Sequence, residues 1–448
     1  MEMKMGLMAI ALATVAVAGC ATDQVNRQPT RFDRSKFHIG GYYLMKCAID
    51  EDHIRDVRDC GIDYIYGIEA NPPQMREVFD LFGKYGLTAF IGGWPNPKPA
   101  TRGKFAETTP LEKLDECAEQ IRANGYLDYP AYQGVYTGDE PSAVDFPHLG
   151  KVIAREQELM PDLLPYLNLY PSYATVYEDE GASSKSQLGT RSYREYIDLY
   201  CKYIPLDYIS LDFYLYAPPD DHLLDRFYSN CQIVADACRR TDREFWFIPQ
   251  VNSRRADDPP SVNKLRFQAY SAMAFGCVNL NWACYSTGWW TNNVLDRAGN
   301  KSVQYEKLKQ VNGEIRRVAP KFMRFRNVAT EYVGFDSQPE ALKLVTEKTP
   351  VRSLDFCQFK DLCAEDRKAL LVGCMTPRKG DSDVRALFVC AADDPFDKAQ
   401  KSRTVKFRCE SKRIRAFGGH GKVELKKLAH GTYSFPIESN EAVFIVAD

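Results

Sequence analysis

The stretch YQGVYTGDEP, from Tyr132 to Pro141, joins an apolar strand to two adjacent carboxylates. Val135 and Tyr136 have the character of a buried strand, and the final proline ends it because proline cannot donate to a sheet ladder. Asp139 and Glu140 therefore stand where the strand stops. Carboxylates are costly in a core but useful at the rim of a barrel. The same Gly-Asp-Glu-Pro residues would also make an ordinary turn, so this stretch alone leaves both interpretations open.

The stretch is the fourth of eight apolar runs, and amphipathic segments typical of helices separate them. The expected strands cover residues 37–45, 62–70, 87–95, 132–141, 163–171, 207–216, 244–252 and 277–286. Eight βα units with near-continuous apolar strands predict a closed parallel barrel, the (β/α)8 or TIM barrel, over residues 37–320. A doubly wound open sheet is the alternative. It is disfavoured because no GxGxxG follows the first strand and because eight strands are many for that class.

The pattern changes after Pro320. Short runs such as VRALFVCAA and AVFIVAD alternate apolar and polar residues, with turns between them. This pattern predicts a small antiparallel β-sandwich over residues 328–448. We expect it to be an accessory domain that packs on the barrel and stabilises it without contributing to the chemistry.

The N-terminus has the pattern of a targeting segment. Lys4 provides a positive start, and the apolar run from Leu7 to Val17 is too short to span a bilayer. The run ends in VAGC, which resembles a bacterial lipobox with Cys20 as the lipid-modified residue. Residues 1–20 are thus expected to be a lipoprotein signal peptide and residues 21–36 a tether. Alanine, not aspartate, follows the cysteine, which by resemblance implies a lipid anchor in the outer membrane of the cell envelope.

Composition restricts the possible partners. The net charge of -2 gives no electrostatic reason to expect nucleic acid. Neither a CxxC pair nor an HExxH motif occurs, so we expect no metal site and no cofactor. Apart from Cys20, the cysteines are spread without tight spacing and several sit inside apolar strands, which leaves disulfides undecided. Aromatic residues make up 12% of the chain, which suits ring-stacking ligands such as sugars.

A barrel of this type carries its chemistry at the C-terminal ends of its strands. Those ends hold carboxylates, amides and aromatic rings, without a His or Cys nucleophile arrangement. Such residues meet the needs of glycosidic bond cleavage, in which carboxylates act on a stacked sugar ring. The candidate catalytic residues are Glu140, Asp139 and Asp212. The candidate substrate-binding residues are Tyr42, Glu69, Trp94, Tyr136, Asn168, Tyr170, Tyr214, Gln250, Asn252, Trp282 and Tyr285, and Trp289 and Trp290 follow in the last loop.

Several candidates also have a purely structural interpretation. Trp282 could simply fill the barrel mouth. Asp212 could form an ion pair with an arginine such as Arg254. Three residues would serve equally well in shaping or anchoring loops: Glu69, Gln250 and Asn252.

The order of the barrel, the carboxylates of strand four, the aromatic eighth strand and the β-sandwich tail resemble bacterial TIM-barrel glycoside hydrolases. The large group with two catalytic glutamates ends strand four in Asn-Glu and strand seven in a nucleophilic Glu. This sequence has Asp139-Glu140 at the first place and Gln250 at the second. It therefore departs from the double-displacement pattern of that group.

The adjacent Asp-Glu pair is instead similar to enzymes of the β-hexosaminidase type. That resemblance implies Glu140 as the general acid and Asp139 as the residue that orients the 2-acetamido group of the substrate as nucleophile. Tyr214 and Trp282 would then belong to the acetamido pocket. Asp212 is the rival second carboxylate, as the base of an inverting reaction or the nucleophile of a retaining one.

Two functions follow from these observations. The first is a surface or periplasmic lipoprotein that hydrolyses glycosidic bonds in glycans, including those with N-acetylhexosamine, with Glu140 as general acid. The second is a carbohydrate-binding lipoprotein that kept a degenerate glycosidase barrel and lost catalysis, which the missing glutamate of strand seven suggests. In both cases the expected partners are a glycan and, through Cys20, a membrane.

Overall fold

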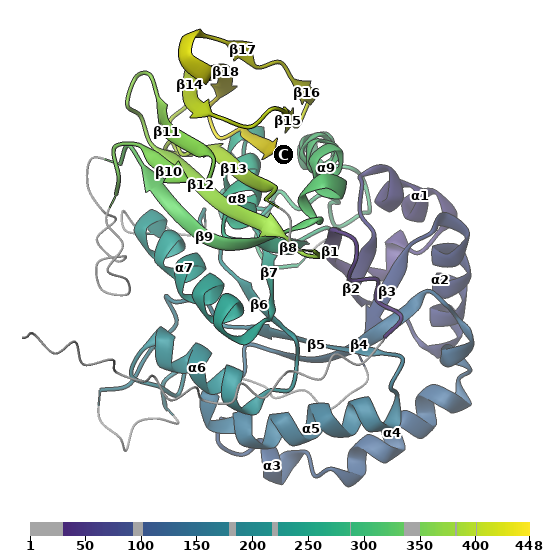
Figure 1. Cartoon of the computed structure of the whole chain (residues 1–448). Helices are drawn as coiled ribbons and strands as arrows, with labels where there is room; N and C mark the ends of the chain where they lie inside the picture. The colour runs from purple at the N-terminus through teal and green to yellow at the C-terminus, as the bar shows by residue number, and fades with distance from the viewer. Residues whose placement is uncertain are drawn as a thin grey trace, which may run out of the picture.

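The computed structural model describes residues 30–92, 102–178, 185–216, 223–286, 288–335, 350–380, 383–399 and 401–448. Eight parallel strands in the order of the sequence close into a barrel, and helices surround it (Figure 1). The strands are β1 (His38–Leu44), β2 (Tyr64–Ile68), β3 (Thr88–Ile91), β4 (Tyr132–Asp139), β5 (Leu164–Leu169), β6 (Tyr208–Asp212), β7 (Glu244–Ile248) and β8 (Cys277–Ala283). The predicted TIM barrel is confirmed.

The helices follow the strands in turn. They are α1 (Glu51–Asp59), α2 (Pro72–Tyr85), α3 (Phe105–Thr108), α4 (Glu112–Ala123), α5 (Phe146–Leu159), α6 (Tyr193–Tyr203), α7 (Leu223–Thr241), α8 (Val262–Ala274) and α9 (Val303–Phe322). Local sequence sets their ends. At α2, Asn71 and Gln74 form a reciprocal capping box and Gly86 closes the helix with φ of 69°. The bounds of α2 are thus encoded in its own flanking residues.

The C-terminal region consists of two antiparallel sheets, which confirms the predicted β-sandwich. One sheet has the order β10-β11-β14-β18-β17 and the other β16-β15-β19-β13-β12-β9. The strands are β9 (Phe325–Val333), β10 (Leu354–Phe356), β11 (Phe359–Ala364), β12 (Leu370–Pro377), β13 (Arg385–Ala391), β14 (Ser402–Cys409), β15 (Ile414–Gly418), β16 (Gly421–Val423), β17 (Lys426–Lys427), β18 (Thr432–Glu438) and β19 (Ala442–Ala447). Their inward faces form a separate apolar core.

The second of these sheets packs against α8 and α9 on the side of the barrel (Figure 1). The backbone of β12 approaches α8 so closely that a methyl group at Gly373 would lie 2.5 Å from the carbonyl oxygen of Ala274. A buried ion pair joins the two helices, with Arg266 Nη2 2.6 Å from Glu314 Oε1. One apolar core runs from the barrel helices into this sheet. The barrel and the sandwich are therefore packed together as one body.

We expect Gly373→Ala to destabilise the protein by about 1–3 kcal/mol, because the added methyl group must displace backbone atoms of α8. Chemical denaturation monitored by circular dichroism measures this change. Gly83→Ala in α2 is the control, since no atom lies within 4 Å of its added methyl group. The control should be neutral or slightly stabilising. Equal stability of both variants would contradict the close approach of β12 to α8.

The segment expected to be a tether ends earlier than predicted. Phe32 is buried at the N-terminal end of the barrel, with its ring centroid 5.2 Å from that of Trp246 and 5.8 Å from that of Phe90. Arg34 pairs with Asp207 and Glu244 at the starts of β6 and β7. Burial of a large aromatic ring among other rings stabilises its packed position. Residues 30–36 thus belong to the folded body, and the expected signal peptide with Cys20 lies outside the described residues.

The described part of the chain has neither a disulfide bond nor a membrane-spanning helix. All thirteen of its cysteines are free thiols, and eight of them are buried. No described helix is long and apolar enough to cross a membrane.

Candidate active site

Two aspartates meet at one amide at the C-terminal end of the barrel. Nδ2 of Asn168, on β5, donates to Oδ1 of Asp139 at 3.1 Å and to Oδ1 of Asp212 at 2.8 Å. Both oxygens bond to the same nitrogen, so they lie within about 6 Å of each other. Asp139 ends β4 and Asp212 ends β6, which are the two neighbours of β5 in the barrel. Adjacent strands therefore bring residues distant in sequence into one site.

A bulge in β4 turns its side chains toward this site. Tyr136 pairs with Tyr166, but Gly138 pairs with the next residue of β5, so β4 holds one extra residue here. The residue between them, Thr137, is buried on the helix side and donates to Oε2 of Glu156 in α5 at 2.8 Å. The side chains of Tyr136 and Asp139 can then both point into the barrel. In a regular strand they would point to opposite faces, because they are three residues apart.

Glu140 leaves the extended conformation. Its φ is 49°, in the left-handed region that non-glycine residues rarely occupy, and its N–H donates to the carbonyl oxygen of Asn168 at 3.0 Å. Neighbours in a regular strand point to opposite faces, so this turn lets two consecutive carboxylates share one site. Asp139 and Asp212 both act electrostatically on the carboxyl group of Glu140, which directly follows Asp139 in the chain. Strained backbone of this kind concentrates at functional sites.

A hydrogen-bonded chain under the carboxylates fixes the orientation of Asn168. Oγ of Ser210 donates to Oδ1 of Asn168 at 3.1 Å, so the amide NH2 must face the aspartates. The hydroxyl of Tyr166 lies 3.4 Å from Ser210 Oγ and accepts from Nδ2 of Asn281 at 3.4 Å. Buried networks with satisfied partners hold their members in one arrangement.

The surroundings favour protonated carboxyl groups at two positions. Burial raises the pKa of Glu140, the nearby charges of Asp212 and Asp139 raise it further, and Arg102 opposes the shift. Burial also raises the pKa of Asp212, together with the charge of Asp139, against a hydrogen bond from Asn168. Each of these groups becomes harder to ionise because a neighbouring carboxylate is already negative.

Asp139 is the carboxylate best placed to keep the negative charge. Burial raises its pKa, but hydrogen bonds from Asn168 and Tyr136 act in the opposite direction. Asp212 is only 1% exposed, and within the described part of the chain no hydrogen bond reaches its Oδ2. A buried carboxylate needs donors to stay ionised. We therefore assign the charge to Asp139 and the protons to Glu140 and Asp212.

Aromatic rings line the mouth above these groups. The ring of Trp289, in the loop after β8, lies 5.4 Å from Tyr42 and 5.6 Å from Tyr214 between centroids. Deeper in the barrel, Tyr66 lies 4.5 Å from Tyr136. Tyr42, Tyr136, Tyr214 and Trp289 are only half-buried, so each keeps part of its surface open to a ligand. Half-exposed aromatic rings beside carboxylates suit a sugar ring.

The structure does not bring Trp282 and Tyr285 to the mouth. The indole of Trp282 is fully buried and donates to Oδ1 of Asn312 in α9 at 2.9 Å. Asn281 points into the barrel toward Tyr166, so its neighbour must point outward. Tyr285 is likewise fully buried, near Cys60 of the α1 region and Tyr305 of α9. Both residues pack the barrel against its helices, and the proposed place of Trp282 in a substrate pocket is corrected.

The other amide and carboxylate candidates form contacts within loops. Oε1 of Gln250 accepts from the N–H of Tyr216 at 2.8 Å and its Nε2 donates to the carbonyl of Asn252 at 2.9 Å. Asn252 in turn donates to the carbonyl of Trp289 at 2.9 Å, so these two amides hold the loops after β6 and β8. Glu69 is exposed and accepts from the N–H of Lys46 at 3.2 Å. Trp94 lies outside the described residues.

Two arginines near the barrel mouth have partners that the sequence did not predict. Arg254 does not pair with Asp212, because its guanidinium lies over the ring of Trp290 at 5.4 Å. Arg102 is the charged neighbour of Glu140 and contacts the hydroxyl of the buried Tyr170 at 3.5 Å. No sequence pattern points to Arg102, because it follows a stretch without regular periodicity.

The alternation of inward and outward side chains along the strands identifies two further residues of the site. Tyr66 on β2 and Ser210 on β6 lie on the inward faces of their strands, in register with neighbours already chosen. Neither residue stands at the C-terminal end of its strand, so the pattern of strand ends does not identify them. Within the described residues, no group of three or more His, Cys, Asp or Glu side chains could hold a metal ion.

Comparison with known proteins supports the fold. No family model matches this sequence, and no curated protein matches it. A solved glycoside hydrolase superposes with a TM-score of 0.52 at 11% identity, covering 92% of each chain. A family 39 glycoside hydrolase from the gut symbiont Bacteroides cellulosilyticus WH2 gives a TM-score of 0.45 at 11% identity, over 93% of this chain and 82% of that one.

A β-galactosidase from the psychrophilic Marinomonas ef1 gives a TM-score of 0.44 at 12% identity. That match covers 63% of this chain, which spans 60% of the length of that enzyme. At 11% identity, the superposition with a TM-score of 0.52 supports a fold shared with that glycoside hydrolase and nothing finer.

Proposed function

We propose that the protein is a glycoside hydrolase. The observation that carries this proposal is the cluster of Asp139, Glu140 and Asp212 around Asn168, beneath half-buried aromatic rings at the barrel mouth. Glycosidic bond cleavage needs a protonated acid and an ionised carboxylate on either side of the bond. The site offers both kinds of group.

Glu140 would act as the general acid. Its raised pKa keeps a proton available, and its place at the end of β4 brings that proton to the barrel mouth. As the bond to the leaving oxygen breaks, Glu140 gives up the proton and positive charge grows at the sugar carbon. Asp139, ionised and held by Asn168 and Tyr136, would stabilise that charge.

The identity of the nucleophile separates two forms of this proposal. In the form similar to β-hexosaminidases, Asp139 orients the 2-acetamido group of an N-acetylhexosamine, which attacks the sugar carbon. The hydrogen bonds that keep Asp139 charged support this form, with Tyr136 and Tyr214 near the acetamido group in place of Trp282. In the other form Asp212 is the second carboxylate, but its burial and its protonation favour a positioning role.

The test is incubation with a panel of oligosaccharides and aryl glycosides, with and without 2-acetamido groups, followed by measurement of new reducing ends. We expect turnover by the wild type and loss of turnover in Glu140→Gln. Preference for 2-acetamido substrates would favour the acetamido-assisted form. No turnover of any member by the wild type, with binding that is the same in Glu140→Gln, would instead favour a carbohydrate-binding protein.

That second function has one observation in its favour. Gln250 stands beyond the end of β7 in place of a carboxylate, and both polar ends of its side chain bond to backbone groups. A barrel that lost a catalytic residue there could still bind sugars through its aromatic rings. The raised pKa of Glu140 favours the enzyme over this alternative, because shifted pKa values of carboxyl groups in a cleft are typical of catalytic sites.

We further propose that Cys20 is acylated and anchors the protein to the outer membrane. The lipobox-like sequence supports this proposal. We expect Cys20→Ala to move the protein from the membrane fraction to the soluble fraction, because the acyl chains supply the stable membrane attachment. Cell fractionation and immunoblotting measure the distribution. Retention of Cys20→Ala in the membrane fraction after a salt wash would contradict the anchor.

A further inference from the structure

The described chain has a sizeable cleft at the end of the barrel opposite the carboxylates. Its volume is about 490 Å³. Arg34, just before β1, forms one wall, and the turn from α9 to β9 forms another with Met323, Arg324 and Phe325. Residues that precede β1 lie at the N-terminal ends of the barrel strands, whereas Asp139, Glu140 and Asp212 lie at the C-terminal ends. The cleft is thus remote from the proposed chemistry.

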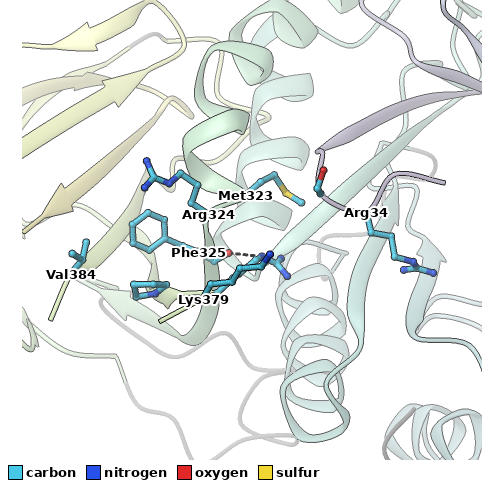
Figure 2. A pocket seen from close by; sticks show the side chains of 9 residues that line it. Arg34, Met323, Arg324, Phe325, Lys379 and Val384 are labelled. Carbon is cyan, nitrogen blue, oxygen red and sulfur yellow. Dashed lines mark hydrogen bonds between the residues drawn. The ribbon is translucent and has the colours of Figure 1, made fainter. Parts of the chain in front are cut away.

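The lining combines cations with apolar side chains. Figure 2 shows Arg324, Lys379, Met323 and Phe325 among the residues that line the cleft. Arg324 and Lys379 are both exposed, and within the described part of the chain neither has an ion-pair partner. Arg34, by contrast, is neutralised by Asp207 and Glu244. The excess positive charge therefore comes from the turn after α9 and the end of β12.

The same positive charge extends along this face. A second hollow of about 580 Å³ shares Arg378 and Lys379 with the cleft and adds the exposed Arg326. Its lining also holds two acidic residues, Asp242 and Glu244, which are outnumbered by its arginines and lysine. It lies at the starts of β7 and β8, again at the N-terminal end of the barrel. Since the whole protein has a net charge of -2, this concentration of cations is a local feature. A face of this kind attracts an extended anionic surface.

The position of the N-terminus adds a second, independent reason. The folded body begins at residue 30, four residues before the Arg34 wall. From Cys20 to that point the chain spans at most about 35 Å when fully extended. A folded chain of this length has a radius of gyration of about 22 Å, so a path from this face around to the barrel mouth is longer than that segment. An anchor at Cys20 would hold the cationic face toward the bilayer.

We propose that the cleft face, defined by Arg324, Arg326, Arg378 and Lys379, docks on the phosphate groups of anionic membrane lipids. The cations contact the phosphates, and the buried side chains of Met323 and Phe325 support the cleft from the core side. The barrel mouth then points away from the membrane, toward glycans in solution. The orientation rests on the proposed anchor at Cys20, but the affinity of the cleft face for anionic lipid does not.

Vesicle co-sedimentation of the chain from Ala21 to Asp448, which keeps every described helix and strand, tests the proposal. The vesicles contain phosphatidylcholine with phosphatidylglycerol, or phosphatidylcholine alone. Each cation at an anionic surface contributes about fivefold to binding. We expect Arg324→Glu/Lys379→Glu to bind the anionic vesicles at least about 20-fold more weakly than the wild type. The control Lys426→Glu/Lys427→Glu, with the same charge change on the exposed strand β17, should bind as the wild type does.

Three results would overturn the docking proposal. The wild type could fail to bind anionic vesicles, it could bind neutral vesicles equally well, or the Arg324→Glu/Lys379→Glu variant could bind anionic vesicles as the wild type does. Inhibition of vesicle binding by millimolar inorganic phosphate would also count against it, because it would indicate a site for a free anion. Reducing-end release by the same variants keeps this test separate from the proposed function, since the cleft variant should retain full hydrolytic activity.

Discussion

Glu140→Gln is expected to lower kcat about 100- to 10,000-fold on glycosides with poor leaving groups, since these need a proton in the transition state. Aryl glycosides with activated leaving groups need little protonation, so their rate of bond cleavage should fall far less. Steady-state kinetics on a matched alkyl and aryl pair of the same sugar measure the two effects. Near wild-type rates of Glu140→Gln on natural glycans would show that Glu140 is not the acid.

The pH profile provides the control for this assignment. A general acid works only while protonated, so activity should fall as pH rises through the pKa of Glu140. Burial raises that pKa, and the carboxyl groups of Asp212 and Asp139 raise it further when they are ionised, which places the fall well above the ordinary ~4.3 of a glutamate. In Glu140→Gln this basic limb should disappear on activated substrates, because the titrating group is gone. Persistence of the limb would assign it to another residue.

Asp139→Asn is expected to slow activated and natural substrates alike, by about 100- to 1,000-fold, because the charge that it removes supports the sugar cation in both cases. Asp212→Asn should cost far less, since Asp212 is already protonated and the amide has nearly the same shape. Comparison of kcat for the two variants on one activated substrate measures the difference. The matched change of carboxyl to amide makes each variant the control for the other.

Removal of the Asp139 charge in Asp139→Asn should also lower the pKa of Glu140. One of the charges that raises the pKa of Glu140 is then absent, so the basic limb of the pH profile should move to lower pH. A merely structural role of Asp139 would lower the rate without this shift. If Asp212→Asn is the slow variant on activated substrates, Asp212 is the second carboxylate and the acetamido-assisted form of the proposal is wrong.

The sequence could predict the barrel because its signals are local and repeated. Each strand of the barrel is an apolar run of ordinary length, and helix boundaries such as Asn71 and Gly86 are set by neighbours in the chain. The Asp139-Glu140 pair could be placed at the end of β4 for the same reason. The change of pattern after Pro320 likewise marked the sandwich, whose strands alternate in burial.

What the sequence could not predict depends on register and on partners far along the chain. The bulge at Thr137 sets which residues of β4 face inward, and it is fixed by pairing with β5. Trp282 looked like a mouth residue at the end of β8, but the strand alternation and the amide of Asn312 direct it outward. Phe32 seemed part of a polar tether because its site, formed by Phe90 and Trp246, exists only in the folded barrel.

The most direct test of the account is a crystal structure of Glu140→Gln with a bound oligosaccharide that spans the site. The account predicts that the glycosidic oxygen lies within about 3 Å of the side chain at position 140. It also predicts that Asp139 lies beside the sugar ring or its 2-acetamido group, with Trp289 stacked on the sugar. A glycan bound elsewhere, or with its glycosidic oxygen turned away from position 140, would contradict the account.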